Sequence, residues 1–533
     1  MNITFAAIGS EQLAISLLSG IAKREGHAVS LVYTPSLFHD RWNLEVPLLN
    51  RFFDETDEVI QQIVKSEPDV LAFSVLTATY QWALHIATEV KKKRPRVKTI
   101  FGGVHISAVP DRVIKKEVVD YLVVGEGEEA FPAILSAIQN KSFTDAIANT
   151  WFKAEDGRII KGPQKGFYQE LDTLPAFDKI LWENDIKVTD KYMTMASRGC
   201  PYRCSFCFNN FFARLPEEKS GKYVRFRSPD HMLAELSFAK ERYGNIRLID
   251  FQDDVFTADK KWLKEFLPRY KNEIDIPFQC LTHPKYLDEE IAALLSDAGC
   301  KWIQMGVQSM DEDFKKNNLQ RFERSDQIAE ACRIMAKYGI KAKLDHMFGL
   351  PEEPVSAQEK ALALYKQYVP ERIQTFWTCY LPGTDLLKEG LAKGVVTPEA
   401  AERLYEGIDF FFYRNEDNIK NPELVKTYKR YEFIFKILPI VPGFIGQRLR
   451  PENIKWIPLF VMGPVAYTAD VITGFMFGNP DFATYARHYM LHIRRHIAGW
   501  FTSTKSDATK NVQKKVKLPV FIPKRNMQLN KTF

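Results

Sequence analysis

The feature that most constrains the fold is an alternation of strand and helix patterns that occurs twice along the chain. In the first 140 residues, five short apolar runs rich in β-branched and aromatic residues are typical of strands. These runs cover residues 2–8, 29–33, 70–76, 97–101 and 121–124. Strands that alternate with helices form a parallel sheet that is covered on both faces. We therefore expect residues 1–140 to form a doubly wound, Rossmann-like α/β domain.

A second series of the same alternation begins near residue 191 and ends near residue 390. Its helical segments separate six further runs that are typical of strands. These runs cover residues 192–196, 246–251, 278–282, 302–307, 342–348 and 374–380. Six successive βα units predict a partial TIM barrel of the (β/α)6 type, with functional residues at the carboxyl ends of its strands. Between the two series, residues 141–190 read as a linker that contains a small strand pair.

Length and charge limit the classes of protein to which the chain can belong. A chain of 533 residues exceeds what one hydrophobic core supports, so several folded units are expected. Residues 501–533 carry a charge of +7, whereas residues 1–500 carry −1. A neutral body argues against a protein that binds nucleic acid over its whole surface. Seven cysteines and the lack of a secretory pattern in the first twenty residues predict a cytoplasmic protein.

Residues 391–533 form a third region, in which charged helical patterns give way to apolar stretches and then to the basic tail. Residues 456–479 are long enough to span a bilayer, but they contain Pro464 and Asp470. We therefore expect a buried helical hairpin here rather than a span. Peripheral contact of the basic C-terminus with anionic lipid headgroups is a further expectation, and a solvated tail is the alternative.

Three cysteines with the spacing CxxxCxxC follow the first strand of the second series. They are Cys200, Cys204 and Cys207. Three thiolates on one loop can occupy three corners of a soft-metal site. A structural zinc ion needs four ligands, usually from a second cysteine pair, and the sequence contains no such pair. The pattern favours a [4Fe–4S] cluster with one open iron; structural or zinc-binding cysteines are the alternative.

The motif, with the aromatic Phe206 before its third cysteine, resembles that of the radical S-adenosylmethionine superfamily. The resemblance implies that Cys200, Cys204 and Cys207 bind the cluster and that S-adenosylmethionine chelates the open iron. It also implies reductive cleavage to a 5′-deoxyadenosyl radical, driven by an external one-electron donor of the flavodoxin or ferredoxin type. In such an enzyme, Phe206 packs near the adenine.

Other segments at the ends of barrel strands resemble the positions that contact S-adenosylmethionine in this family. Asp253 and Asp254 correspond to the contact with the methionine amino group, and a helix N-cap is the alternative for Asp254. Gln308 and Ser309 correspond to the approach to the ribose, and Gly349 to the turn that admits the adenine. Two further candidates, for which structural hydrogen bonding is the alternative, are His283 and Arg321.

The first domain resembles a cobalamin-binding domain because glycines and polar residues follow its strands. The candidate contacts are Ser74, Thr77, Gly102, Gly103, His105, Gly125, Glu126 and Gly127. Glycines at strand ends let a flat corrin approach the backbone. The DxHxxG sequence that gives cobalt a histidine in some such domains is absent, so we expect cobalt without a protein histidine. His105 is the one candidate for such a cobalt-binding histidine. We favour instead a hydrogen bond from His105 to the corrin periphery, or a contact within the loop. A plain nucleotide-binding domain is the alternative.

Over residues 1–390, the two domains together resemble the group that contains the anaerobic magnesium-protoporphyrin monomethyl ester cyclase and the cobalamin-dependent radical methylases. The resemblance implies a [4Fe–4S] cluster, S-adenosylmethionine and cobalamin as cofactors. We expect methylation of an unactivated carbon in an apolar or lipid-like small molecule. An oxidative cyclase or rearrangement enzyme is the first alternative. A non-catalytic iron–sulfur and cobalamin sensor and a zinc-bearing binding module are the others.

Overall fold

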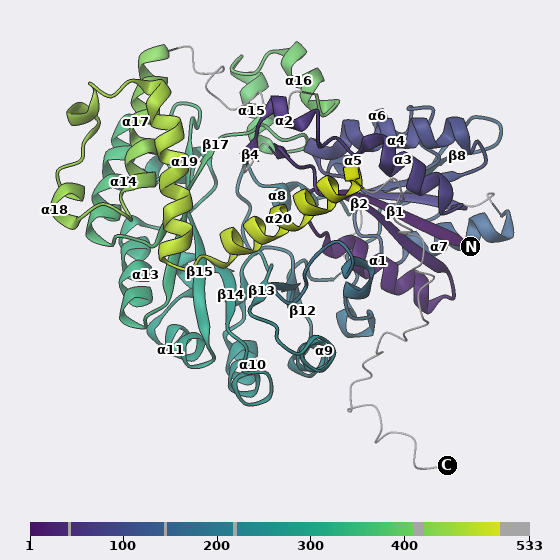
Figure 1. Cartoon of the computed structure of the whole chain (residues 1–533), viewed down its shortest axis with the longest axis horizontal. Helices are drawn as coiled ribbons and strands as arrows, with labels where there is room; N and C mark the ends of the chain where they lie inside the picture. Colours follow the sequence, from purple (N-terminus) through teal and green to yellow (C-terminus); the bar gives the residue numbers. More distant parts are fainter. Residues whose placement is uncertain (41–43, 143–145, 217–220, 409–420, 502–533) are drawn as a thin grey trace.

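The computed structural model describes residues 1–40, 44–142, 146–216, 221–408 and 421–501. These residues form two sheets, each covered by helices, and a helical carboxyl-terminal region that contacts both (Figure 1). The predicted α/β class and the order of the domains are confirmed. The basic segment 502–533, for which lipid contact is expected, lies outside the described residues.

The first sheet has seven strands in the order β2-β1-β5-β6-β7-β8-β9. Its strands are β1 (Asn2–Ile8), β2 (Ala28–Thr34), β5 (Val70–Ser74), β6 (Lys98–Gly102), β7 (Tyr121–Val123), β8 (Thr150–Lys153) and β9 (Ile159–Lys161). The first five strands are parallel, and β8 and β9 are antiparallel additions at one edge. A small antiparallel pair, β3 (His39–Asp40) and β4 (Leu44–Glu45), lies outside this sheet. The strand pair that the sequence predicts after residue 141 thus extends the first sheet.

Helices cover both faces of the first sheet. They are α1 (Leu13–Arg24), α2 (Pro47–Asn50), α3 (Thr56–Lys65), α4 (Tyr80–Lys93), α5 (Val104–Ala108), α6 (Pro110–Val113) and α7 (Ala130–Asn140). Ile15 of α1 and Phe131 of α7 belong to one core, whereas Ile63 of α3 and Ile86 of α4 belong to the other. The doubly wound architecture is therefore confirmed. In such a sheet, ligands bind beyond the carboxyl ends of the strands, at the point where the strand order reverses.

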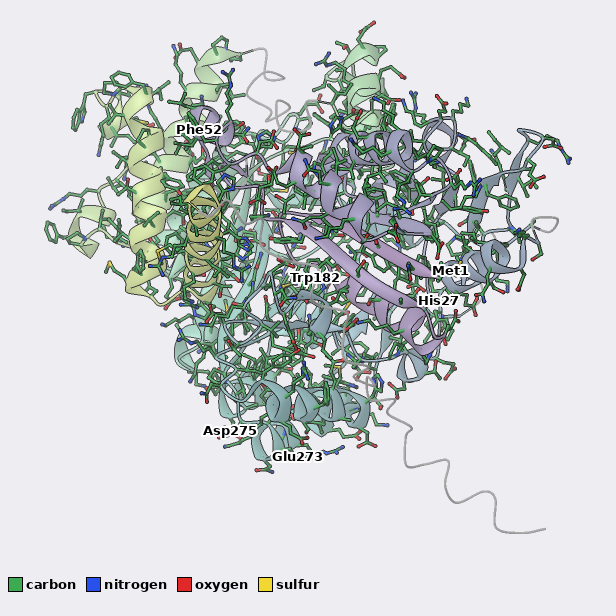
Figure 2. The ribbon with its side chains drawn as sticks, turned by 45° about the vertical axis from the view of Figure 1, so that its right-hand side comes forward. Met1, His27, Phe52, Trp182, Glu273 and Asp275 are labelled. Carbon is green, nitrogen blue, oxygen red and sulfur yellow. The ribbon has the colours of Figure 1, made fainter. Side chains whose placement is uncertain are left out.

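The two ends of the first sheet can be told apart in Figure 2. Met1 and His27 are labelled together at the amino ends of β1 and β2, where the Met1 amino group lies 3.4 Å from His27 Nδ1. Trp182, also labelled in Figure 2, is completely buried against α1, where its indole donates to Ser16 Oγ at 2.9 Å. The segment around Trp182 therefore holds the linker against the first domain.

The second sheet has six parallel strands in chain order, as the (β/α)6 prediction requires. Its strands are β10 (Tyr192–Thr194), β13 (Ile249–Phe251), β14 (Phe278–Thr282), β15 (Cys300–Gln308), β16 (Lys341–Phe348) and β17 (Arg372–Trp377). The helices are α8 (Phe208–Phe212), α9 (Pro229–Tyr243), α10 (Lys260–Glu273), α11 (Glu289–Asp297), α12 (Glu312–Asn318), α13 (Ser325–Lys337) and α14 (Val355–Gln367). A short antiparallel pair, β11 (Ser197–Arg198) with β12 (Arg225–Phe226), flanks the cysteine loop, which lies between the two strands in the chain.

Polar side chains start the barrel helices where the sequence leaves a strand. The Ser228 hydroxyl accepts from His231 N before α9, and carboxylates of Asp259 and Asp288 accept from the first turns of α10 and α11. Such caps satisfy amide groups that have no partner within the helix. The helices are thereby fixed with their apolar faces on the sheet, where they form one continuous core.

The carboxyl-terminal region is helical, as predicted. Its helices are α15 (Asp385–Ala392), α16 (Pro398–Tyr405), α17 (Pro422–Ile437), α18 (Gly443–Gly446), α19 (Leu459–Met476) and α20 (Pro480–Phe501). The expected buried hairpin within residues 456–479 is wrong: α19 is a single helix, and Phe460 and Phe475 on it are 81% and 68% exposed. Its apolar composition predicts burial, but only one face of the helix finds a partner in α17.

Candidate active site

The three cysteines lie on the loop between β11 and α8, at the carboxyl edge of the barrel. Cys207 is the N-cap residue of α8, and its amide donates to the Cys204 carbonyl at 3.0 Å. Ser205 anchors the loop, because its hydroxyl donates to the Asn318 carbonyl at 2.7 Å and its own carbonyl accepts from Leu386 N at 2.9 Å. The loop is therefore held from α12 on one side and from α15 on the other.

Of the thiols of this loop, that of Cys204 is buried, and those of Cys200 and Cys207 are half-buried. Burial raises the pKa of Cys200 to about 12 and that of Cys207 to about 11, and it also raises the pKa of Cys204. Buried thiols without a metal stay protonated at neutral pH, and a soft metal binds them by displacing the protons. The donor set therefore suits iron or another thiophilic metal.

Within the described residues, no three His, Cys, Asp or Glu side chains converge closely enough to hold a single metal ion. The three cysteines therefore do not form a ready site for a single ion. A structural zinc site needs four ligands that converge on one ion. In an iron–sulfur cluster, by contrast, each cysteine binds a different iron, so the sulfur atoms stand farther apart. The arrangement fits a cluster better than a zinc ion.

A buried cation lies against the cysteine loop. Arg321 Nη1 is 4.0 Å from Cys204 Sγ, its Nη2 donates to the Gly306 carbonyl at 2.9 Å, and its Nε donates to Glu323 Oε1 at 2.9 Å. His283, the second candidate, has Nε2 at 3.3 Å from Glu323 Oε2, and its ring stacks on Tyr202 at 3.9 Å between ring centroids. Both candidates thus lie beside the cysteines, and each also makes structural contacts.

Glu323 and Lys315 complete this buried group, and the sequence reasoning missed both. The Lys315 ammonium, completely buried, lies 3.4 Å from Glu323 Oε1. Burial opposes ionisation of Glu323, but His283, Arg321 and Lys315 hold its pKa well below the usual range. The Glu323 carboxylate is therefore charged and positions the Arg321 guanidinium. The one sequence signal for this role is that Arg321 and Glu323 lie two residues apart in the segment after α12.

The two predicted aspartates differ in their surroundings. Asp253 is completely buried and accepts from Ala196 N at 3.1 Å and from the backbone and hydroxyl of Ser197. It therefore positions the chain just before the cysteine loop. Asp254 is exposed and accepts from Asn209 Nδ2 at 2.8 Å. Because Asn209 belongs to α8, Asp254 faces the cluster-binding helix, and its contact with the methionine amino group stays a prediction.

Gln308 and Ser309 lie at the end of β15, as predicted. The Gln308 backbone has a left-handed φ of +61°, an unusual conformation for a residue with a side chain. Its Oε1 atom is buried without a hydrogen-bond partner among the described residues. A buried oxygen with no partner is costly unless a ligand donates to it. Gln308 therefore fits the contact with a bound ribose hydroxyl.

Ser309 leads to a second residue that the sequence reasoning missed. Ser309 is completely buried and lies close to the Glu353 carboxyl, which is also buried. Gln358 Nε2 donates to the same carboxyl at 2.9 Å. Burial raises the pKa of Glu353 to about 8, so this group is mostly protonated at pH 7. A neutral carboxyl next to Ser309 adds a proton donor to this edge.

Gly349 and Phe206 lie on facing elements. Gly349 follows β16 directly and has a φ of +72°. Phe206 packs against the cluster formed by Phe314, Met347 and their neighbours, so it reaches from the cysteine loop to the end of β16. The two residues that the resemblance assigns to the adenine are thus brought to one side of the barrel. Their contact with adenine stays a prediction.

In the first domain, the glycines lie at the predicted edge. Ser74 and Gly102 are paired at the ends of β5 and β6, while Gly125 and Gly127 follow β7. Gly103 has a φ of +102°, and a Cβ atom here would lie 2.6 Å from Val75 N and 2.7 Å from Val75 O. No side chain fits at this position. The bare backbone at this edge suits the close approach of a flat ligand such as a corrin.

His105 and Thr77 lie beneath this edge rather than on it. His105 is completely buried, with Nδ1 at 3.1 Å from Thr77 Oγ1 and its ring 4.4 Å from the Tyr80 ring centroid. Burial lowers the pKa of His105 to about 4, so the ring is neutral. These contacts favour a structural role that fixes the loop after β6. That cobalt binds without a protein histidine stays a prediction.

Glu126 connects the two domains. Its carboxylate accepts from Arg225 at 2.8 and 2.9 Å, from Tyr168 N at 2.7 Å, and lies 3.5 Å from Arg198 Nη1. Arg198 also pairs with Glu128. Because Arg198 belongs to β11 before the cysteine loop and Arg225 to β12 after it, Glu126 ties the glycine edge to the cluster edge. A positioning role is therefore better supported than a direct contact with cobalamin.

The two edges meet directly. Helix α5, which follows Gly103, contacts α8, which follows the cysteines. A Cβ atom on Gly383 would lie 3.1 Å from the Phe211 ring and 3.2 Å from Ala108 Cβ, so residues of both domains and of the turn after β17 converge here. The residues assigned to the two cofactors therefore border one shared region.

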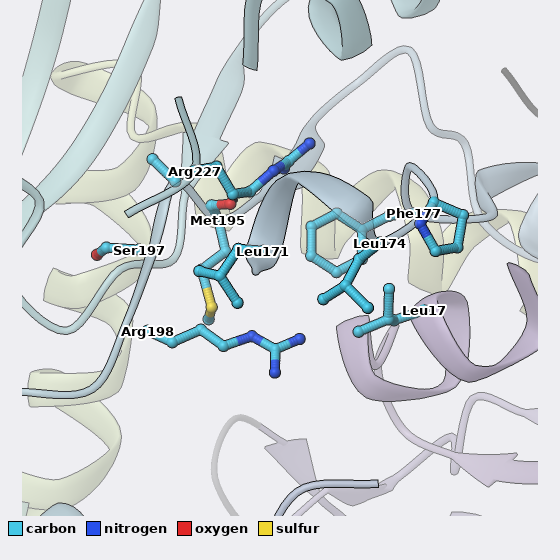
Figure 3. A pocket seen from close by; sticks show the side chains of 10 residues that line it. Leu17, Leu171, Leu174, Phe177, Met195, Ser197, Arg198 and Arg227 are labelled. Carbon is cyan, nitrogen blue, oxygen red and sulfur yellow. Dashed lines mark hydrogen bonds between the residues drawn. The ribbon is translucent and has the colours of Figure 1, made fainter. Parts of the chain in front are cut away.

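A separate pocket lies on another side of the domain junction. Figure 3 shows Leu17 of α1, Leu171 and Leu174 of the linker, and Met195, Arg198 and Arg227 around it. None of the cysteines and none of the predicted cofactor contacts lines this pocket. Arg227 and Arg198 are both engaged by carboxylates, with Glu235 accepting from Arg227 at 2.6 Å. This pocket is therefore a packing gap between domains rather than the site.

Comparisons with known proteins agree with both halves of the site. The model described as Radical SAM superfamily matches residues 195–364, and the B12 binding domain model matches residues 11–135. The chain is 24% identical over 72% of its length to an uncharacterized methyltransferase of Pyrococcus horikoshii, of which it covers 82%. It is 22% identical over 70% of its length to the anaerobic magnesium-protoporphyrin IX monomethyl ester cyclase of Rubrivivax gelatinosus, of which it covers 65%.

Two solved structures have the same fold. The cobalamin-dependent S-adenosylmethionine radical enzyme OxsB, with aqua-cobalamin bound, matches with a TM-score of 0.63 and 14% identity over 97% of this chain and 82% of its own. The radical S-adenosylmethionine methyltransferase TsrM from Kitasatospora setae matches with a TM-score of 0.59 and 16% identity over 73% of this chain and 76% of its own. With the site geometry and both domain matches, the chain belongs to the cobalamin-binding radical S-adenosylmethionine enzymes, which use a [4Fe–4S] cluster, S-adenosylmethionine and cobalamin.

Proposed function

We propose that this enzyme methylates an unactivated carbon of an apolar or lipid-like small molecule. The observation that carries the proposal is the contact between the glycine edge of the first domain and the cysteine-bearing edge of the barrel, through α5 and α8. When bound, the cluster with S-adenosylmethionine would supply a 5′-deoxyadenosyl radical, and the corrinoid would supply a methyl group. A substrate carbon between the two edges is within reach of both.

The chain's own residues divide the work of such a site. Cys200, Cys204 and Cys207 hold the cluster, and Arg321 places a positive charge beside it. Gln308 and the protonated Glu353 offer an acceptor and a donor at the end of β15 and the turn after β16. The buried pairs of Glu126 and Glu128 with the arginines fix the separation of the two edges. Fixed edges exclude water and keep the substrate oriented.

The curated relatives support methylation over other radical outcomes, without deciding it. They include a bacteriochlorophyllide d methyltransferase of Chlorobaculum tepidum at 24% identity and a hopanoid C-3 methylase of Methylococcus capsulatus at 23%. The names of both relatives point to large, apolar substrates. A radical cyclase is the second candidate function, because the cyclase of Rubrivivax gelatinosus is nearly as similar, at 22% identity.

Electron supply and location are part of the proposal. Reduction of the cluster calls for an external one-electron donor of the flavodoxin or ferredoxin type. Cysteines that must stay free to bind iron suit the cytoplasm, where thiols are kept reduced. The basic residues of segment 502–533 are suited to peripheral contact with the inner face of the membrane, where an apolar substrate is available.

The direct test is a methyl-transfer assay. The anaerobically reconstituted enzyme is incubated with methyl-deuterated S-adenosylmethionine, a reductant and an organic-solvent extract of the source cells. We expect a deuterated methyl group in an apolar product, with S-adenosylhomocysteine and 5′-deoxyadenosine formed in equal amounts. Formation of 5′-deoxyadenosine without S-adenosylhomocysteine or labelled product would reject methylation and favour the cyclase. Cys204→Ala should abolish both nucleosides, whereas Cys332→Ala, a buried cysteine of α13, should retain them.

A further inference from the structure

Helix α19 exposes a wide apolar face. It is 18 residues long and packs against α17 with one side (Figure 1). The residues on the other side include Phe460, Val461, Val465, Tyr467, Ile472 and Phe475, each between 36% and 81% exposed. At 100° per residue these side chains fall on one half of the helix. A contiguous apolar face of this size on a protein surface marks an interaction site.

The exposed face of α19 carries no charge. Asp470 is the one residue of the helix that is charged at neutral pH, and it points to the protein. Its carboxylate accepts from Lys436 Nζ at 2.8 Å and from Arg372 Nε at 3.1 Å. Burial opposes ionisation, but these two cations lower the pKa of Asp470, so the ion pairs persist at neutral pH. They fasten α19 to α17 and β17, which orients the apolar face outward.

The segment that precedes the helix carries further exposed apolar side chains. Phe444, Ile445 and Trp456 are 67%, 41% and 79% exposed. Three exposed cations are interleaved with them, and none pairs with an acid among the described residues. They are Arg448, Arg450 and Lys455. We call these six residues and the outward face of α19 the α19 surface.

The composition of the α19 surface identifies its partner. Exposed Phe and Trp side chains with basic residues at their margin are the pattern of helices that lie in the headgroup layer of a membrane. Cations beside the apolar face select anionic lipids. A second basic element, the sequence 502–533 with eight Lys or Arg and one acid, follows α20 directly. An anionic membrane accounts for the apolar and the basic residues together. A protein partner would need both an apolar patch and an acidic surface that match them.

We propose that the α19 surface docks on the interfacial layer of an anionic membrane, with α19 lying in the membrane plane rather than crossing it. The helix is long and apolar enough to span, and 22% of it is buried against the protein. The ion pairs of Asp470 hold that buried side in place, so docking needs no unfolding. This inference builds on the peripheral membrane contact proposed above and assigns it to a folded surface. It does not depend on the reaction that the enzyme catalyses.

The test is co-sedimentation of the full-length, reconstituted enzyme with vesicles. Vesicles of phosphatidylcholine with phosphatidylglycerol are compared with vesicles of phosphatidylcholine alone. We expect binding to the anionic vesicles, and about a tenfold loss of affinity in the variant Phe460→Glu/Phe475→Glu, because two charges then enter the apolar layer. Arg448→Glu/Lys455→Glu should lose about as much on anionic vesicles, more at low salt than at high salt.

The matched control is Leu48→Glu, since Leu48 of α2 is 71% exposed on the first domain. It should bind vesicles as the wild type does. All variants should cleave S-adenosylmethionine at the wild-type rate in vesicle-free solution, so loss of docking is distinguishable from loss of the proposed chemistry. Wild-type enzyme that fails to bind anionic vesicles, or α19 variants that bind undiminished, would overturn the proposal. Equal binding to neutral vesicles would overturn the anionic preference. A dimer that the α19 substitutions dissociate, without vesicle binding, would assign the surface to a second copy.

Discussion

At the scale of single residues, the charge of Arg321 is the closest influence on the cysteine loop. A reduced cluster carries one more negative charge than an oxidised one, so a guanidinium 4.0 Å from Cys204 Sγ stabilises the reduced state. We expect Arg321→Gln to lower the midpoint potential of the cluster by roughly 50–100 mV, the scale of a partly screened charge at this distance. An EPR-monitored redox titration measures the shift.

Two variants separate charge from structure at this position. Arg321→Lys keeps the positive charge, so the midpoint potential of the cluster should stay close to that of the wild type. The variant loses the two guanidinium hydrogen bonds, to the Gly306 carbonyl and to Glu323. Arg333→Gln removes an exposed arginine of α13 and should leave the potential unchanged. An unaltered potential in Arg321→Gln would show that the cluster does not sense this residue.

Glu353 makes the stability of the protein depend on pH. Burial raises its pKa to about 8, against an ordinary value of 4.5. Between these two values the unfolded chain releases the proton while the folded chain keeps it, so the residue lowers stability increasingly as pH rises. Glu353→Gln stays neutral and removes this dependence. We expect the variant to melt near the wild-type temperature at pH 5 and clearly above it at pH 8, with a difference of up to a few kcal/mol.

Thermal melts of the two proteins across this pH range measure the effect. Glu353 also accepts a hydrogen bond from Gln358. A change in this bond would shift the melting temperature of the Glu353→Gln variant by the same amount at every pH. Only the widening gap between pH 5 and pH 8 reports the titration. A variant that melts below the wild type at pH 8 would show that Glu353 is ionised and stabilising.

At the scale of elements, the turn after β6 depends on Gly103. An added Cβ would collide with the Val75 backbone, and the left-handed φ of +102° adds its own cost of about 1 kcal/mol. We expect Gly103→Ala to lower the melting temperature and to reduce the corrinoid retained per chain at least severalfold. Gly26→Ala is the matched control, because Gly26 has a φ of +88° with open space around it. Equal effects of both substitutions would show that backbone strain alone matters.

The elements themselves were largely predictable from the sequence. Strands such as β1 and β5 fall within a residue or two of their predicted bounds, because short apolar runs ended by turns specify a buried strand. The cysteine loop was predictable because its three cysteines lie within eight residues and form a recognisable motif. The edge formed by Gly102 and Gly103 follows from the strand pattern.

What the sequence could not supply depends on contacts between distant elements. Glu126 reads as a ligand contact until Arg225, far along the chain, takes both of its oxygens. Glu323 and Lys315 look like surface charges until the fold buries them together. The apolar composition of α19 predicts burial, because composition does not show that only one face of the helix has a partner. Each of these errors is a matter of tertiary placement rather than of local propensity.

At the scale of the whole molecule, ion pairs hold the two cofactor edges at a fixed separation. Glu126 and Arg225 are 13% and 4% exposed, so removing one partner leaves a buried charge without compensation. We expect Glu126→Leu and Arg225→Met each to lower stability by about 3–5 kcal/mol, and the double variant to recover much of the loss. Thermal melts and limited proteolysis of the 141–190 segment measure it. Additive losses in the double variant would contradict a coupled pair.

Helix α20 bridges the same two bodies on another side. It starts at the barrel, where Asp481 accepts from Lys343 at 2.8 Å and from Lys191 at 2.9 Å. Farther along, it reaches the first domain, where Phe38 N donates to the Tyr489 hydroxyl at 2.9 Å and His496 Nε2 lies 2.8 Å from the Phe52 carbonyl. Its middle packs His488 against Tyr33 at the end of β2. The domains are therefore joined at two places, which suits an enzyme whose two cofactors must act on one substrate.

The central claim is that one chain holds both cofactors and uses them together. The most direct measurement is anaerobic reconstitution with iron, sulfide and hydroxocobalamin, followed by incubation with S-adenosylmethionine and a reductant. The account predicts a brown protein that retains about one corrinoid per chain after gel filtration and forms 5′-deoxyadenosine. A protein that forms the nucleoside but retains no corrinoid would contradict the assignment of the first domain, and one that forms no nucleoside would contradict the account of the cysteine loop.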